Sequence, residues 1–320
     1  MTDAGPGAWE SLLATFVLNA GLALTVGALA SLVWTTHARS GWAAILRARS
    51  SACLAVGIGL TVVAEVGDLW ARSADAAGVA WPDAWPAVRS MLTASHYGSA
   101  WIAGMLALLG LAAIARFGLA DRRHSSASAL SAASVCIAVF VYTRSVVSHA
   151  SQGGDLSLSV AVDWLHLVLI ALWVGVVFVA SVVAGIVGPE PSRAAVEDRH
   201  DLVEWIGALS RTATLALVGI VVTGSFNVWR GTGGALASLP GSTYGTVLFA
   251  KLCFVVVAIA LGAYNRFRIL PPLFADLRRA QGTSMPLRHF IRVIRCEAAT
   301  LAVALALAAV LGATEADATS

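Results

Sequence analysis

The feature that most constrains this chain is a succession of apolar stretches, each long enough to cross a membrane as a helix. About 20 helical residues, rising about 1.5 Å each, cover the roughly 30 Å of hydrocarbon in a bilayer. Eight stretches reach this length, at residues 12–34, 52–70, 95–117, 127–147, 160–187, 206–229, 244–263 and 291–312. With 58% hydrophobic and 12% charged residues, the chain is too apolar for a soluble protein. We predict an all-α polytopic membrane protein with about eight transmembrane helices in contact with membrane lipid.

The arginines orient these spans, because basic residues in short loops stay on the cytoplasmic side of a membrane. They gather after the first, third and seventh spans, as Arg39, Arg47, Arg49, Arg116, Arg122, Arg123, Arg266, Arg268, Arg278, Arg279 and Arg288. We expect these loops inside and both termini outside. The formal net charge of +3 then reflects topology, and no basic soluble module remains that would bind nucleic acid.

The spans fall into two sets of four, in residues 1–155 and residues 156–320. His96-Tyr97-Gly98 opens the third span, and Thr243-Tyr244-Gly245 opens the seventh. Two four-span halves share one orientation, so this pattern is compatible with a parallel four-plus-four repeat about an axis along the membrane normal.

Ionisable residues inside the spans are the candidates for function, because hydrocarbon tolerates a charge only where it is paired, hydrated or functional. Glu65 and Asp68 share one face of the second span, in its outer third, at i, i+3 spacing. Lys251, the one lysine of the chain, lies inside the seventh span. It either extends toward the face of Glu65 and Asp68 or belongs to a gated charge network.

Three histidines fall in the same outer layer as these carboxylates. His96 opens the third span, His149 follows the fourth, and His166 lies in the fifth, one turn beyond Asp163. Neutral imidazoles suit copper or zinc, and a carboxylate such as Asp163 fixes the tautomer of a ligating ring. Cys136, near mid-membrane, is a candidate to receive Cu(I) from that site, with ordinary packing as its alternative.

Two other functions are open for these histidines. Paired histidines on neighbouring helices also suit the iron of haem b, so a membrane redox protein with bis-histidine ligation is the leading alternative. A structural subunit without a ligand, whose histidines simply lie at the membrane interface, is the third.

The remaining polar residues of the later spans have structural interpretations. Thr223, Asn227 and Arg230 form a stripe on the sixth span that is more typical of hydrogen bonds between helices than of a substrate site. Glu297 in the eighth span is interpreted as an interfacial ion pair with Arg292 and Arg295.

Several separated motifs of the second half resemble the bacterial CopD copper-resistance membrane family over roughly residues 145–312. They are Ser148-His149-Ala150, Asp163-Trp164-Leu165-His166, Leu172-Trp173-Val174-Gly175, Thr223-Gly224 with Asn227, Tyr244-Gly245 with Lys251-Leu252, Asn265-Arg266 with Leu270-Pro271, and the run from Arg292 to Glu297. The first half resembles the family only in its helix pattern and His96-Tyr97-Gly98. The family often has a second glycine where this chain has Val176, so a close helix approach is less expected there.

The resemblance implies copper transport across the bacterial inner membrane, by uptake from the periplasm, and it matches the family's histidines to His149 and His166. It also implies a separate CopC-like periplasmic copper protein as partner, since the outer loops are too short for such a domain. Together with the residue analysis it gives a candidate metal site of His149, His166 and His96, with Asp163, Glu65, Asp68, Cys136, Trp173 and Lys251 as supporting or pathway residues. No nucleotide-binding or catalytic motif is apparent, so we expect a carrier, alone or as an oligomer, and not an enzyme.

Overall fold

The computed structural model describes residues 8–119, 126–183, 196–231, 243–279 and 285–317 of the chain. Within these ranges the protein is helical and contains no strand. Eight of its helices are long and apolar enough to cross a membrane. The predicted all-α polytopic membrane fold is therefore confirmed.

The eight long helices contain the predicted spans almost completely. They are α1 (Ala8–Trp34), α2 (Gly41–Ala77), α4 (His96–Ala113), α5 (Ala127–Val146), α6 (Leu158–Val183), α7 (Val196–Gly231), α8 (Thr243–Tyr264) and α10 (Met285–Asp317). α2 and α7 begin several turns before their spans, because an apolar run marks only the part of a helix that lies in hydrocarbon. Residues 184–187 of the fifth predicted span lie outside the described residues.

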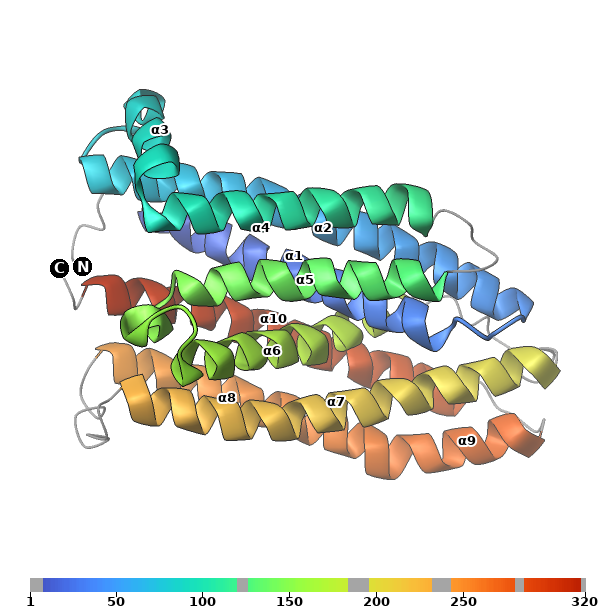
Figure 1. Cartoon of the computed structure of the whole chain (residues 1–320). Helices are drawn as coiled ribbons and strands as arrows, with labels where there is room; N and C mark the ends of the chain where they lie inside the picture. The colour runs from blue at the N-terminus through green and yellow to red at the C-terminus, as the bar shows by residue number, and fades with distance from the viewer. Residues whose placement is uncertain (1–7, 120–125, 184–195, 232–242, 280–284, 318–320) are drawn as a thin grey trace.

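The short elements were not predicted from the sequence. These are η1 (Trp81–Asp83), α3 (Trp85–Ala94), η2 (Ile114–Gly118), η3 (His149–Gly153), η7 (Asn265–Ile269) and α9 (Leu270–Arg279). α3 and α9 have only 10 residues each, about half of what a membrane crossing needs, so a search for long apolar runs passes over them. α3 lies across one end of the bundle, next to the start of α4 (Figure 1).

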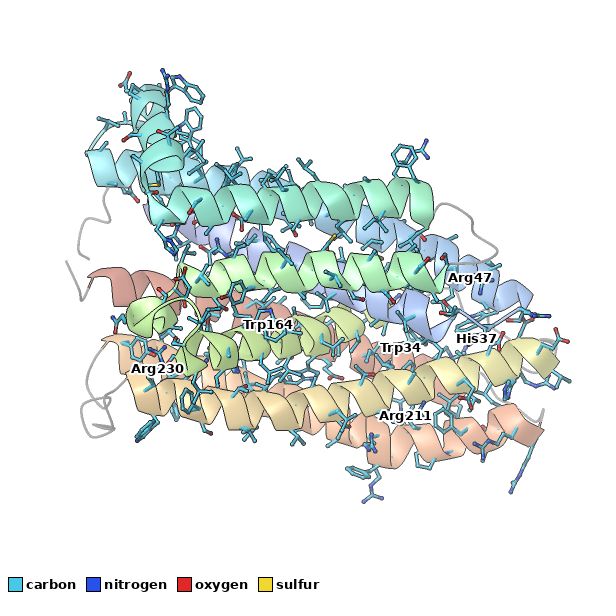
Figure 2. The ribbon with its side chains drawn as sticks, in the orientation of Figure 1. Trp34, His37, Arg47, Trp164, Arg211 and Arg230 are labelled. Carbon is cyan, nitrogen blue, oxygen red and sulfur yellow. The ribbon has the colours of Figure 1, made fainter. Side chains whose placement is uncertain are left out.

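The two ends of the bundle carry different loops. α1 begins and α10 ends at the same end, as an even number of crossings requires (Figure 1). We call this the outer end, in keeping with the predicted orientation. Arg230 lies there, whereas His37 and Arg47 lie at the opposite, inner end (Figure 2). Arg122 and Arg123, which also supported the orientation, are outside the described residues.

Helix α1 runs through the core and packs against both α2 and α6. The backbones of α1 and α6 touch at Gly27 and Gly175, since a Cβ added at Gly175 would lie 1.9 Å from the carbonyl oxygen of Ala23. Glycine is required at both positions because no side-chain atom fits between the helices. The close approach that Val176 made less expected is therefore supplied by Gly175, while Val176 itself is buried.

Helix α7 is held to α1 and α2 at the inner end. The ring of Trp205 packs edge-on against Trp34 and Trp42, with centroids 6.4 Å and 6.1 Å away. Its Nε1 donates to the Ser31 hydroxyl over 3.0 Å, and the Asp198 carboxylate accepts from the backbone N–H of Trp42 over 2.9 Å. These contacts fix the position of α7 along α1, and so place its polar stripe opposite α6.

Candidate metal site at the outer end of the bundle

Two contacts between polar side chains connect α6 to α7 near the outer end. The amide nitrogen of Asn227 donates to Asp163 Oδ1 over 3.4 Å, and His166 Nδ1 lies 2.8 Å from the hydroxyl of Thr223. Asp163 and His166 are three residues apart on one face of α6, and Thr223 and Asn227 are four residues apart on one face of α7. All four side chains therefore lie at one helix interface. The prediction that Thr223 and Asn227 join helices by hydrogen bonds is confirmed.

The tautomer of His166 is coupled to the Thr223 hydroxyl. A hydroxyl has one hydrogen, and Thr223 Oγ1 lies 2.7 Å from the Gly219 carbonyl oxygen, in the usual geometry of a threonine bond to the preceding turn, as well as 2.8 Å from His166 Nδ1. When that hydrogen is donated to the carbonyl, the contact with His166 is donated by the Nδ1–H of the ring. A neutral imidazole with its proton on Nδ1 has a free lone pair on Nε2, which is the form that binds a metal ion.

The His166 ring also lies directly against the backbone of α7. A Cβ added at Gly224 would be 3.0 Å from the ring carbon Cε1 of His166, which is tighter than an ordinary contact. Glycine at this position therefore lets the imidazole approach the helix closely enough to reach Thr223. This role of Gly224 was not predicted from the sequence, where Thr223-Gly224 was recognised only as a motif; the matched spacings on α6 and α7 were the available signal for it.

The residue before His149 in the chain, Ser148, contacts this interface. The backbone of His149 begins η3, and its side chain is outside the described part of the structure. The preceding hydroxyl, Ser148 Oγ, lies 3.3 Å from Asp163 Oδ2. The chain at position 149 thus passes next to the carboxylate that lies one turn from His166.

His96 lies at the start of α4, with its side chain 57% exposed. Its Nε2 is 3.4 Å from Asp155 Oδ1, on the segment between η3 and α6. Among the described side chains, which do not include His149, no group of three or more His, Cys, Asp and Glu could hold a metal ion. The site of His96, His149 and His166 therefore stays a prediction.

Glu65 and Asp68 belong to a separate charge network between α2, α4 and α5. Arg144 Nη1 lies 3.3 Å from Glu65 Oε1 and 3.5 Å from Asp68 Oδ2, while Arg72 Nε lies 2.8 Å from Asp68 Oδ2. The Tyr97 hydroxyl donates to the same Asp68 oxygen over 3.2 Å. Two carboxylates and two guanidiniums balance in charge, so this network can exist inside the bundle without a metal ion.

The three other predicted pathway residues lie on three different helices. Lys251 on α8 is near enough to His166 for its charge to act on that ring. Trp173 is buried on α6, two turns inward from His166. The Cys136 thiol on α5 faces α4, because a Cβ added at Gly110 would lie 3.6 Å from its sulfur.

Glu297 does not form the predicted interfacial ion pair. It is buried, whereas Arg292 and Arg295 are exposed, and no ion pair joins these residues in the described structure. The two arginines are five and two residues away from it, and at 3.6 residues per turn side chains at these separations point to different faces of the helix. The prediction was wrong because it took closeness in sequence for closeness on the helix surface.

Comparison with known proteins gives the same family as the sequence motifs. Residues 203–311 match the model of the family described as copper resistance protein D, CopD. Over 239 residues the chain is 27% identical to the Copper resistance protein D of Pseudomonas syringae pv. tomato, covering 74% of this chain and 73% of that protein. The predicted CopD resemblance is confirmed. No solved structure matches the chain.

The segment that matches the family model forms one side of the helix interface described above. Thr223, Asn227 and Lys251 lie within residues 203–311, whereas His149 and His166 precede the matched range. The two side-chain contacts between α6 and α7 therefore join the matched segment to the helix that comes before it.

Proposed function

We propose that this protein carries copper ions across the bacterial inner membrane, by uptake from the periplasm through a site built on His166 and His149. The observation that supports this most is the bond from His166 to Thr223, because it leaves the Nε2 lone pair of His166 free for a metal ion. The family match and the name of the relative from Pseudomonas syringae indicate copper as that metal.

The surroundings of His166 suit a metal that is bound and then released. Imidazole nitrogen is a good ligand for copper, and Asp163 stands one turn away to support a second ring from η3. Asn227 Oδ1 is buried without a hydrogen-bond partner in the described structure, so an oxygen acceptor remains free there. The positive charge of Lys251 opposes a resident cation, which suits a carrier that has to pass its cargo on.

His96 is proposed as the outermost ligand. Its exposed imidazole and the neighbouring Asp155 carboxylate form a contact point at the outer end, where a CopC-like periplasmic copper protein would deliver its metal. From there copper passes to His149 and His166 and then inward along α6 past Trp173. The protein acts in this proposal as a carrier and not as an enzyme.

The test is the double variant His149→Ala with His166→Ala, measured for copper uptake by cells and for metal content after purification. We expect uptake and bound copper to be lost while the amount of protein in the membrane is unchanged. His37→Ala removes an exposed histidine at the inner end and should change neither. Uptake at the normal level in the double variant would refute the site.

Absorption spectra of the unaltered protein and of the double variant distinguish copper from haem. A strong visible band of the unaltered protein that disappears in the double variant would replace the copper proposal with bis-histidine haem ligation. Copper in stoichiometric amount, lost in the variant and without that band, would support it.

A further inference from the structure

A second polar site lies inward of His166, in a cavity of about 210 Å³ between α6, α7, α8 and α10. Apolar side chains form most of its wall. Two buried polar side chains also line it, Glu297 of α10 and Asn265 of η7, which are only 4% and 5% exposed. The copper proposal uses neither of them.

The burial of these two groups is not compensated within the described structure. Glu297 makes no hydrogen bond or ion pair there, and Asn265 Oδ1 is buried without a hydrogen-bond partner. Arg266 in the same wall is already engaged, because its Nη1 donates to the carbonyl and the hydroxyl of Ser210 over 3.1 Å and 2.9 Å. The Glu297 carboxylate lies against Gly262, where an added Cβ would be 3.1 Å from Oε1.

The chemistry of the cavity points to a proton. An ionised carboxylate without a partner is far more costly inside a membrane protein than a neutral carboxylic acid. A carboxyl group and an amide carbonyl are hard oxygen donors, unlike the nitrogen and sulfur ligands that Cu(I) prefers. A proton on Glu297, in contrast, gives an O–H donor in a cavity where Asn265 Oδ1 is a free acceptor.

We propose that Glu297, with Asn265, is a proton-binding site that exchanges its proton with the cytoplasmic side. The cavity extends toward the inner end of the bundle, since Ser210 and Arg266 line it and Arg211, next to Ser210, lies in the inner half (Figure 2). The step is a simple ionisation, in which the carboxylic acid releases H⁺ to water at the inner end and keeps the electron pair as a carboxylate.

The position of this site suits it to compensate the charge of a transported copper ion. This role rests on the proposed function. Trp173 follows His166 by seven residues and Leu217 precedes Thr223 by six, so the cavity begins about 10 Å inward of the copper site on both helices. A copper ion that enters this interface brings positive charge. Release of the proton from Glu297 compensates that charge.

The test uses dicyclohexylcarbodiimide, an apolar reagent that adds to protonated carboxylic acids in membrane proteins, on the full-length protein in detergent. The Glu65 carboxyl is the internal control, because it is buried to the same degree but lies beside Arg144. Peptide mass spectrometry near neutral pH should show Glu297 modified at least about tenfold more than Glu65, since an ion-paired carboxylate stays ionised. Modification of Glu297 should decline as the pH is raised.

Two variants and one control variant make the test specific. Glu297→Gln should abolish the modification of its peptide without changing copper binding at the outer end. Gly262→Ala places a methyl group against the carboxyl and should slow the reaction, whereas Gly312→Ala, with no atom within 4 Å of the added carbon, should not. Equal modification of Glu65 and Glu297, no modification of Glu297, or protection by sodium at constant pH would overturn the proton site.

The experiments can refute the proton site and the copper site independently of each other. Modification of Glu297 in a protein that takes up no copper would refute the copper proposal alone. Copper uptake in a protein whose Glu297 is not modified would refute the proton site alone.

Discussion

Replacement of Thr223 by valine tests the tautomer argument at the candidate copper site. Valine keeps the shape of threonine but removes the oxygen that lies 2.8 Å from His166 Nδ1. The Nδ1–H then has no acceptor, and the ring is free to move its proton to Nε2, where it would block a metal ion. The hydrogen bond from Thr223 to the Gly219 carbonyl is lost as well, but that bond joins two residues of the same helix and does not connect α7 to α6.

The expected loss can be estimated in two independent ways. Leaving a buried donor unsatisfied costs about 1–3 kcal/mol. Removing the outer partner of a metal-binding histidine typically costs about 10–100-fold in affinity, which is about 1.4–2.8 kcal/mol at about 1.4 kcal/mol per tenfold change. We therefore expect Thr223→Val to weaken copper binding by about 10–100-fold while the protein stays folded.

The assay is a titration of purified protein against a chromophoric copper chelator of known affinity. Thr223→Ser keeps the hydroxyl and should bind nearly as well as the unaltered protein. Thr300→Val removes a hydroxyl that donates only to the Cys296 carbonyl, within α10, and measures the cost of losing such an intrahelical bond. An unchanged affinity in Thr223→Val, or an equal loss in Thr300→Val, would refute the tautomer argument.

Two further predictions concern the stability of the bundle. Arg144→Met leaves Glu65 and its neighbouring carboxylate short of one buried cation, which should destabilise the protein by about 3–5 kcal/mol in detergent unfolding experiments. Adding Glu65→Gln should restore part of this loss, and no restoration would contradict the pairing. In Gly175→Ala the new Cβ would lie 1.9 Å from the Ala23 oxygen instead of at least 3.4 Å, so α1 and α6 must separate and the yield of folded protein should fall. Gly59→Ala, with open space around it, is the matched control, and a similar yield for both variants would rule out the close contact.

The sequence predicted well what depends on one helix at a time. Apolar runs located the eight spans, because each must by itself cover the hydrocarbon core. The sequence places His37, His200 and His289 in or beside loops of the inner end among arginines, and all three are exposed.

What depends on several helices could not be predicted from spacing. The sequence placed Asp163 and His166 on one face of a helix and Thr223 and Asn227 on another, but it gave only their depths. Which faces meet is decided by the packing of the whole bundle, through contacts as remote as that of Trp205 with Ser31 at the other end. For the same reason Glu65 and Asp68 appeared available for a metal pathway until their arginine partners were located.

The contact of Gly27 with Gly175 has a mechanical consequence for transport. Where two backbones touch, the helices cannot slide or tilt without a clash, so α1 and α6 act as one rigid body. The opposite side of α6 is different, because it meets α7 through two polar bonds and, further inward, through a cavity. Movement that opens a path for an ion would therefore occur on that side, and it would stretch the bond that prepares His166 for its metal. Ligand release and opening of the path would then be a single motion.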